Sequence, residues 1–105
     1  MMNQKNHDDA MAEVYQNDPA YALELLNSVL ADGDQDELLI VLRQLAKAFG
    51  GVQVLADKAR INPACIDKNF FTDGNPALGS FRAILDAMGM RLAVEPKHQS
   101  LVHGS

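Results

Sequence analysis

Residues 51–94 read GVQVLADKARINPACIDKNFFTDGNPALGSFRAILDAMGMRLAV, and this stretch decides the fold. Apolar side chains recur at helical spacing over residues 52–59, and a tight break follows at residues 60–62. A second short helix is predicted over residues 63–70. Two short helices joined by a tight turn are typical of a helix-turn-helix, whose second helix presents its exposed face to DNA. We therefore predict a helix-turn-helix over residues 51–70.

The flanking sequence predicts an all-α fold. Cap residues and apolar stripes indicate five helices, which begin and end near residues 18–32, 34–49, 52–59, 63–70 and 77–88. Residues 90–94 alternate large apolar residues with others, which predicts a short C-terminal strand. Since one strand cannot pair its own backbone, we expect a twofold mate to pair with it in a dimer.

Length and composition favour one helical domain with two tails. We place a polar tail over residues 1–17, the helical domain over residues 18–95 and a second tail over residues 96–105. The first tail is expected either to be partly disordered or to form a loose helix over residues 10–15. The single cysteine, Cys65, excludes an internal disulfide and fits a reducing compartment. The charged N-terminal segment does not resemble a signal peptide, and no apolar run is long enough to span a bilayer. We expect a cytoplasmic protein with no membrane partner.

The charge of −5 is unevenly distributed along the chain. Residues 1–37 hold nine acidic residues and one basic residue, whereas residues 38–105 hold eight basic and five acidic residues. The C-terminal part could therefore lie on phosphates, while the N-terminal part suits a basic protein. The alternative is that these acidic residues are solvated helix faces and caps.

No residue pattern indicates an enzyme, a metal site or a cofactor. The three histidines, His7, His98 and His103, lie in the expected tails without ligand spacing. Cys65 has no histidine next to it in sequence, and the paired glycines at residues 50–51 lack the rest of a phosphate-binding loop.

The helix-turn-helix predicts a set of DNA contacts. The residues expected to position phosphates are Gly51, Val52, Gln53, Lys58 and Asn62. The residues expected to reach base edges are Ala64, Asp67 and Lys68, with Asn69 at the rim. This face lacks Arg, Gln and Ser at its reading positions, so a helix-turn-helix kept for packing alone is the alternative.

Two runs carry a family resemblance. Residues 38–63, LLIVLRQLAKAFGGVQVLADKARINP, and residues 73–94, DGNPALGSFRAILDAMGMRLAV, are similar to the HigA-like addiction-module antidote family. Its members are small bacterial helix-turn-helix antitoxins of the lambda-repressor-like class, and the similarity covers about residues 18–94. The resemblance implies a five-helix DNA-binding fold, usually dimeric. It also implies a small, basic, RelE-like ribonuclease toxin as partner, and an operator that the antidote represses.

The second helix departs from that family pattern. Members usually carry a polar stretch such as NPTQLYRTL, whereas residues 62–70 read NPACIDKNF. The change affects the reading face and leaves the apolar positions in place. We therefore keep two hypotheses: an antitoxin that neutralises a RelE-like toxin and binds operator DNA as a dimer, and a toxin- or partner-binding module that has lost DNA binding.

Overall fold

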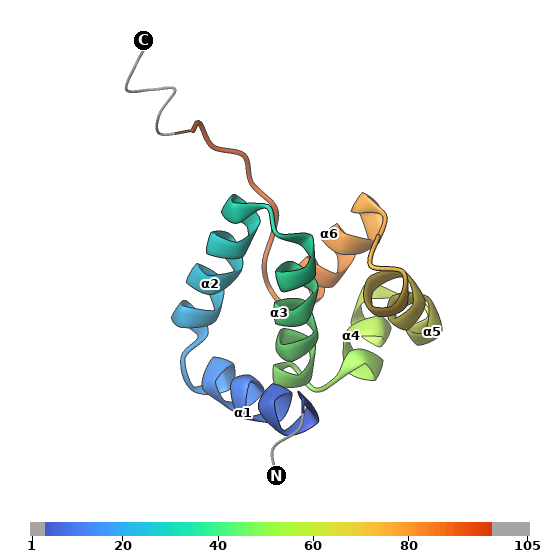
Figure 1. Cartoon of the computed structure of the whole chain (residues 1–105). Helices are drawn as coiled ribbons and strands as arrows, with labels where there is room; N and C mark the ends of the chain where they lie inside the picture. The colour runs from blue at the N-terminus through green and yellow to red at the C-terminus, as the bar shows by residue number, and fades with distance from the viewer. Residues whose placement is uncertain (1–3, 98–105) are drawn as a thin grey trace.

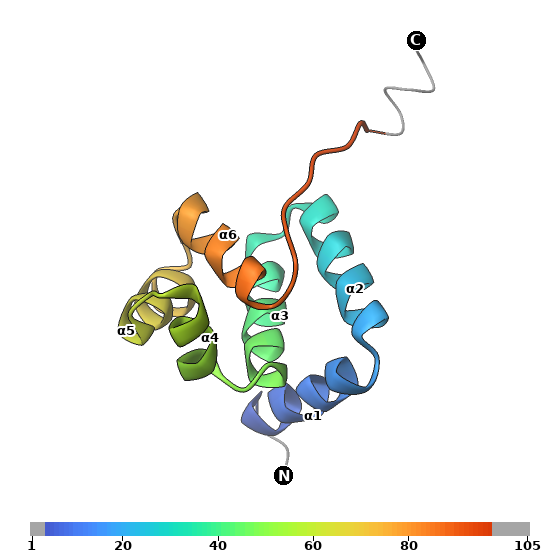
Figure 2. The same cartoon turned by 180° about the vertical axis from the view of Figure 1, so that it is seen from behind.

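A computed structural model describes residues 4–97, and it is all-helical (Figure 1). The elements are α1 (Gln4–Asn17), α2 (Pro19–Asp32), α3 (Gln35–Ala48), α4 (Val52–Ala59), α5 (Pro63–Ile66), the π-helical turn η1 (Asp67–Thr72) and α6 (Leu78–Ala87). Helix α3 stands at the centre, with α1 across its lower end and α2 along one side. Helices α4 and α5 lie on the other side of α3 (Figures 1 and 2). The predicted all-α class is confirmed.

The core forms where the other helices meet α3. Among its members, Phe70, Leu45, Leu55 and Leu85 are the largest side chains that are fully buried. Burying a side chain of this size contributes roughly 1.5–3 kcal/mol relative to leaving it in water. Because these four come from η1, α3, α4 and α6, the core holds the predicted helix-turn-helix segment against the rest of the chain.

The predicted helix starts at Asp18 and Asp34 are confirmed. The Asp18 carboxylate accepts a hydrogen bond from the Tyr21 amide at 3.1 Å, and the Asp34 carboxylate accepts one from the Glu37 amide at 3.1 Å. Each bond satisfies an N–H group that the helix itself leaves without a partner. These two caps fix where α2 and α3 begin.

A sharp bend separates α3 from α4. The two helix axes meet at 90°. Gly50 and Gly51 adopt φ angles of 107° and 102°, a region that residues with a β-carbon rarely enter. The paired glycines therefore allow the chain to turn at once from the central helix into α4.

The predicted C-terminal strand is wrong for the chain alone. Residues 91–97 are extended and exposed, and no strand occurs among residues 4–97. Met90 donates its amide to the Leu85 carbonyl at 2.8 Å, and no backbone hydrogen bond to another described residue involves residues 91–97. An alternating pattern needs a neighbouring strand before it can form a ladder, and an all-helical chain offers none.

The N-terminal segment differs from the polar tail expected over residues 1–17. Residues 4–17 form α1, so the chain has six α-helices within the described range where five were expected. Helix α1 packs on α3 partly through a buried carboxylate, Asp8, beside Ala12 and Tyr15. A helix with a polar residue on its buried face shows little apolar periodicity, which is why the pattern indicated at most a loose helix over residues 10–15.

No single helix within residues 4–97 is both long enough and apolar enough to cross a membrane. Helices α3 and α4 reach that length and composition only when counted together across their 90° bend.

Candidate functional site

A tight turn joins α4 to α5. Arg60 ends α4 with φ 60° and ψ 43°, and it is the one residue other than glycine with positive φ in the described range. The Ile61 amide donates to the Ala56 carbonyl at 2.9 Å. The Asn62 side-chain oxygen accepts a hydrogen bond from the Ala64 amide at 2.8 Å, which caps α5. The break predicted at residues 60–62 is therefore present, with Asn62 as the predicted cap.

The segment from α5 through η1 has one buried side and one exposed side. Ile66 and Phe70 are buried, as predicted from their spacing. Ala64, Asp67 and Lys68 are exposed to solvent. The three residues predicted to reach base edges thus share an accessible surface, which no other part of the described chain covers.

The residues predicted to contact phosphates are divided between surface and core. Gln53, Lys58 and Asn62 are exposed, whereas Gly51 and Val52 are half-buried at the start of α4. Val52 packs against the core cluster. Three polar side chains of this set can therefore contact a ligand, whereas Gly51 and Val52 can contact it only through their backbone.

An ion pair weakens the positive charge of the second helix. Lys68 donates to the Asp73 carboxylate at 2.9 Å, and its side chain remains 70% exposed. The hydrogen bond and the negative charge of Asp73 raise the pKa of Lys68. Asn69, predicted at the rim, is half-buried, and its carbonyl accepts a bond from the Asn75 amide at 2.9 Å. Asp73 therefore offsets part of the positive charge that Lys68 presents to another anion.

Arg60 was not among the predicted contacts, although it lies in the turn beside them. Its side chain is exposed and lines an open hollow with Gln53, Asp57 and Pro63. Its position in a break between two helices was visible in the sequence and could have identified it. Counting Arg60, residues 51–75 hold three basic and three acidic residues, so this surface has no net charge.

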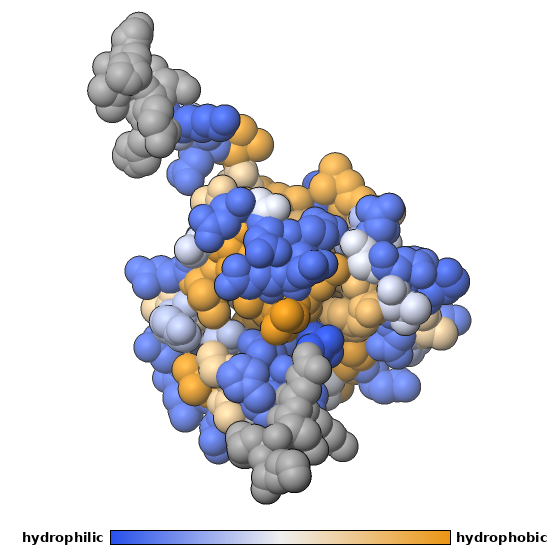
Figure 3. Space-filling view, in the orientation of Figure 1, coloured by the Kyte–Doolittle hydropathy of each residue, from blue (hydrophilic) through white to orange (hydrophobic). Residues whose placement is uncertain are grey.

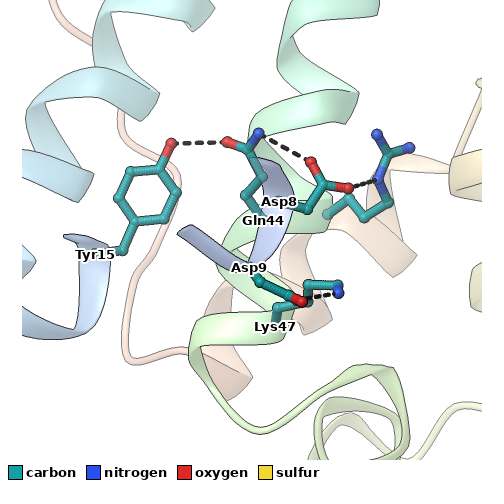
Figure 4. A network of polar contacts seen from close by, with 6 residues as sticks. Asp8, Asp9, Tyr15, Gln44 and Lys47 are labelled. Atoms are coloured by element: carbon teal, nitrogen blue, oxygen red, sulfur yellow. Dashed lines mark hydrogen bonds and ion pairs between the residues drawn. The ribbon is translucent and has the colours of Figure 1, made fainter. Parts of the chain in front are cut away.

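A second group of polar residues joins α1 to α3 (Figure 4). The Tyr15 hydroxyl donates to the Gln44 side-chain oxygen at 3.0 Å, and the Gln44 amide donates to Asp8 at 3.1 Å. Arg43 donates to the other oxygen of Asp8 at 3.0 Å. Burial, with smaller contributions from the charges of Tyr21 and Asp8, raises the pKa of Tyr15. These bonds satisfy a carboxylate and an amide that are both buried.

Several acidic residues of the N-terminal third are engaged within the chain. Asp8 and Asp9 pair with Arg43 and Lys47 of α3, and Asp18 and Asp34 serve as caps. The remaining five of the nine are exposed: Glu13, Glu24, Asp32, Asp36 and Glu37. Asp18 and Asp34 are therefore caps, as that alternative expects, whereas the exposure of the other five is compatible both with solvated helix faces and with a surface for a basic partner.

Comparison with known families identifies the chain. A family model described as "Probable addiction module antidote protein" matches residues 6–96. The chain belongs to this family. An antidote acts against a cognate toxin, so the family implies a toxin as partner and a regulatory rather than catalytic role. Searches among curated proteins and solved structures found no match.

Proposed function

We propose that this antidote is the antitoxin of a type II toxin–antitoxin module, of the HigA-like, lambda-repressor-like class. It neutralises a small, basic, RelE-like ribonuclease toxin and binds operator DNA as a dimer to repress its own operon. The observation that carries the proposal is the antidote family match over residues 6–96. The two short helices and their tight turn at residues 60–62 support the DNA-binding part.

In the proposed complex the start of α4 and the turn hold phosphates, and the exposed side of α5 and η1 faces the bases. Lys68 meets a guanine edge or a phosphate, and Asp67 accepts a bond from a cytosine amino group. Ala64 contacts a thymine methyl. Two copies would address half-sites one helical turn apart, about 34 Å, or a multiple of that spacing.

A gel-shift titration with the DNA upstream of the gene tests this part. Lys68→Ala should weaken binding and flatten the log–log salt dependence by roughly one unit, because one phosphate contact is lost. Arg82→Ala is the matched control, since Arg82 is also exposed but lies on α6. An unchanged slope for Lys68→Ala, or an equal change for Arg82→Ala, counts against the assigned role of Lys68.

The toxin part rests on the five exposed acidic residues. Glu24 and Asp32 lie on α2, which carries no basic residue, so α2 presents uncompensated negative charge to a basic toxin. Opposite charges speed encounter and raise the salt sensitivity of association. Deleting residues 1–33 would remove core side chains such as Leu26, so substitutions give the cleaner test.

The experiment measures inhibition of the toxin by purified antidote. Glu24→Lys combined with Asp32→Lys should slow complex formation and reduce its salt dependence. Asp57→Lys combined with Asp86→Lys makes the same change of charge at exposed positions on α4 and α6. If the two double variants lose the same amount of toxin inhibition, net charge alone matters and α2 is rejected as the docking face.

A second candidate function is an antidote that has lost DNA binding. The balanced charge of residues 51–75 and the ion pair of Lys68 with Asp73 favour it. Full neutralisation of the toxin without any gel shift, with or without the toxin present, would select this alternative.

A further inference from the structure

An apolar notch lies between α3 and the start of α6. Its volume is about 230 Å³, and it is lined by Leu38, Leu39 and Leu42 of α3 and by Leu78 and Phe81 of α6. Leu42 is buried, whereas Leu78 is 66% exposed, more than any other large apolar side chain on the described helices. A cavity of about 150 Å³ with such a lining admits benzene, so the notch has room for one aliphatic or aromatic side chain of a partner.

A hydrogen bond fixes one end of the notch. Gln35, in the first turn of α3, donates its side-chain amide to the Gly74 carbonyl at 3.1 Å, and Gln35 and Pro76 complete the lining. This bond ties α3 to the loop before α6. Most of the lining side chains also pack in or against the core. The notch is therefore preformed, and a partner does not have to order it on binding.

Negative charge gathers at the start of α3, beside the notch. Residues 32–42 and 74–82 together hold one basic residue, Arg82, and four acidic residues: Asp32, Asp34, Asp36 and Glu37. None of these five forms an ion pair within the described part of the chain. Asp36 precedes Leu39 by three residues, so the two side chains are neighbours on the surface of α3. The notch therefore has a negatively charged border.

Helix stability accounts for only part of this charge. Asp34 caps α3, and the helix dipole favours Asp36 and Glu37 in its first turn. Asp32 is the last residue of α2, where the dipole disfavours an acidic side chain. It precedes Gln35 by three residues, so the Cα atoms of Asp32 and Gln35 are at most about 11 Å apart. Asp32 thus adds negative charge near the notch without stabilising its own helix.

Three helix ends share one edge of the molecule. The end of α2, the start of α3 and the start of α6 lie along the upper edge in Figures 1 and 2. Apolar surface at the start of α6 stands beside hydrophilic surface over the start of α3 (Figure 3). This edge therefore continues the α2 face that the proposed function gives to the toxin, and it adds an apolar site to that face.

We propose that the notch anchors a basic protein, which inserts one large apolar side chain beside Leu78 and places lysines or arginines against Asp32 and Asp36. The inference rests on the proposed function, in which this partner is the toxin. Apolar side chains seated in pockets carry much of the binding energy of an interface. Charges around the pocket set the rate of encounter and its salt dependence. The negative edge thus attracts the partner, and the notch slows its release.

Charge disfavours the other occupants. A second copy of the chain also has a charge of −5, so two such edges would repel each other. DNA phosphates are negative as well. None of the nine residues predicted to contact DNA lines the notch. A basic protein is the occupant that both the apolar lining and the charged border favour.

Surface plasmon resonance tests the notch, with the purified product of the reading frame beside the antidote gene as the probe. Leu78→Ala should speed release about tenfold and change the association rate by less than about twofold, because an apolar contact forms after encounter. Asp36→Lys should instead slow association about fivefold and flatten its salt dependence, because charge acts before contact.

Two matched controls accompany these variants. Val14→Ala removes an exposed apolar side chain from α1, and Asp57→Lys makes the same charge change on α4, outside the notch. Each should leave both rates within about twofold of wild type, because neither side chain borders the notch. All four altered residues are exposed, so circular dichroism should show an intact helical fold in every variant.

The outcomes separate the notch from the proposed function. If the wild-type chain binds the probe and Leu78→Ala releases it no faster than Val14→Ala, the notch is rejected and the proposed function stands. Equal association rates for Asp36→Lys and Asp57→Lys would reject the charged border. Self-association of the wild-type chain that Leu78→Ala abolishes would assign the notch to a second copy and overturn the proposal. A wild-type chain that does not bind the probe would reject the toxin part of the proposed function together with the notch.

Discussion

Replacing Asp8 with alanine tests how α1 is held on α3. Asp8 is 4% exposed and accepts two side-chain hydrogen bonds, from Gln44 and from Arg43. Alanine removes the acceptor from both donors. Gln44 is itself buried, and the terminal nitrogen Nη2 of Arg43 is already buried without a partner. The variant therefore leaves a buried amide and a partly buried cation without their anion.

The expected loss of stability follows from burial. Removing one partner of a fully buried ion pair costs about 3–5 kcal/mol of stability, whereas an exposed pair contributes up to about 1 kcal/mol. The Arg43 side chain is 32% exposed, so water replaces part of what it loses. We expect a loss of about 2–3 kcal/mol, which is a large share of the roughly 5–15 kcal/mol that stabilises a domain.

Urea unfolding followed by circular dichroism measures the effect. A loss of this size should lower the midpoint by about 1–2 M for a protein of this length. Asp9→Ala is the matched control, because Asp9 pairs with Lys47 on the same two helices but is largely exposed. It should cost about 1 kcal/mol or less. Equal losses for the two variants would refute the argument that burial makes the Asp8 pair stronger.

Three further predictions follow from single residues. Burial raises the pKa of Tyr15 above its ordinary 10.0. The stability that the neutral Tyr15 side chain contributes is therefore complete below pH 10.0 and is lost as the pH rises through the raised pKa. Tyr15→Phe should remove this alkaline loss in pH-dependent melting and cost about 1–2 kcal/mol at neutral pH, because the buried Gln44 oxygen loses its donor. Asp73→Asn should tighten operator binding in gel shifts, because it releases Lys68 and removes an acidic residue; an unchanged affinity would place Lys68 outside the interface. Arg60→Gly should change stability by no more than about 1 kcal/mol, because glycine relieves the left-handed strain, yet weaken DNA binding through the lost charge.

Local signals predicted most of the helices. Asp18 and Asp34 mark helix starts by a mechanism that acts within four residues, so α2 and α3 could be placed from the sequence. Helix α1 could not, because its buried face carries Asp8, whose partners are 35 and 36 residues away. Long-range polar pairs leave no periodic pattern. The strand expected at residues 90–94 was wrong because pairing requires a second chain segment.

The candidate site was predictable in outline and not in its electrostatics. The exposure of Asp67 and Lys68 follows from the burial of Ile66 and Phe70 on the same short helix. The Lys68–Asp73 pair does not follow, because residues five apart point in different directions on an α-helix. The structure is π-helical there, and the Asp73 amide donates to the Lys68 carbonyl at 2.7 Å. This wider turn brings the two side chains together.

The ion pair of Lys68 with Asp73 leaves the uncompensated positive charge of the predicted DNA surface near the turn. Lys68 is neutralised by Asp73, while Lys58 and Arg60 form no ion pair within the described residues. These two lie at the end of α4, where they meet phosphates more readily than base edges. Phosphate contacts give affinity that depends on salt and carries little sequence information. A DNA complex of this chain should therefore depend strongly on ionic strength and discriminate weakly between operators, unless contact with DNA separates Lys68 from Asp73.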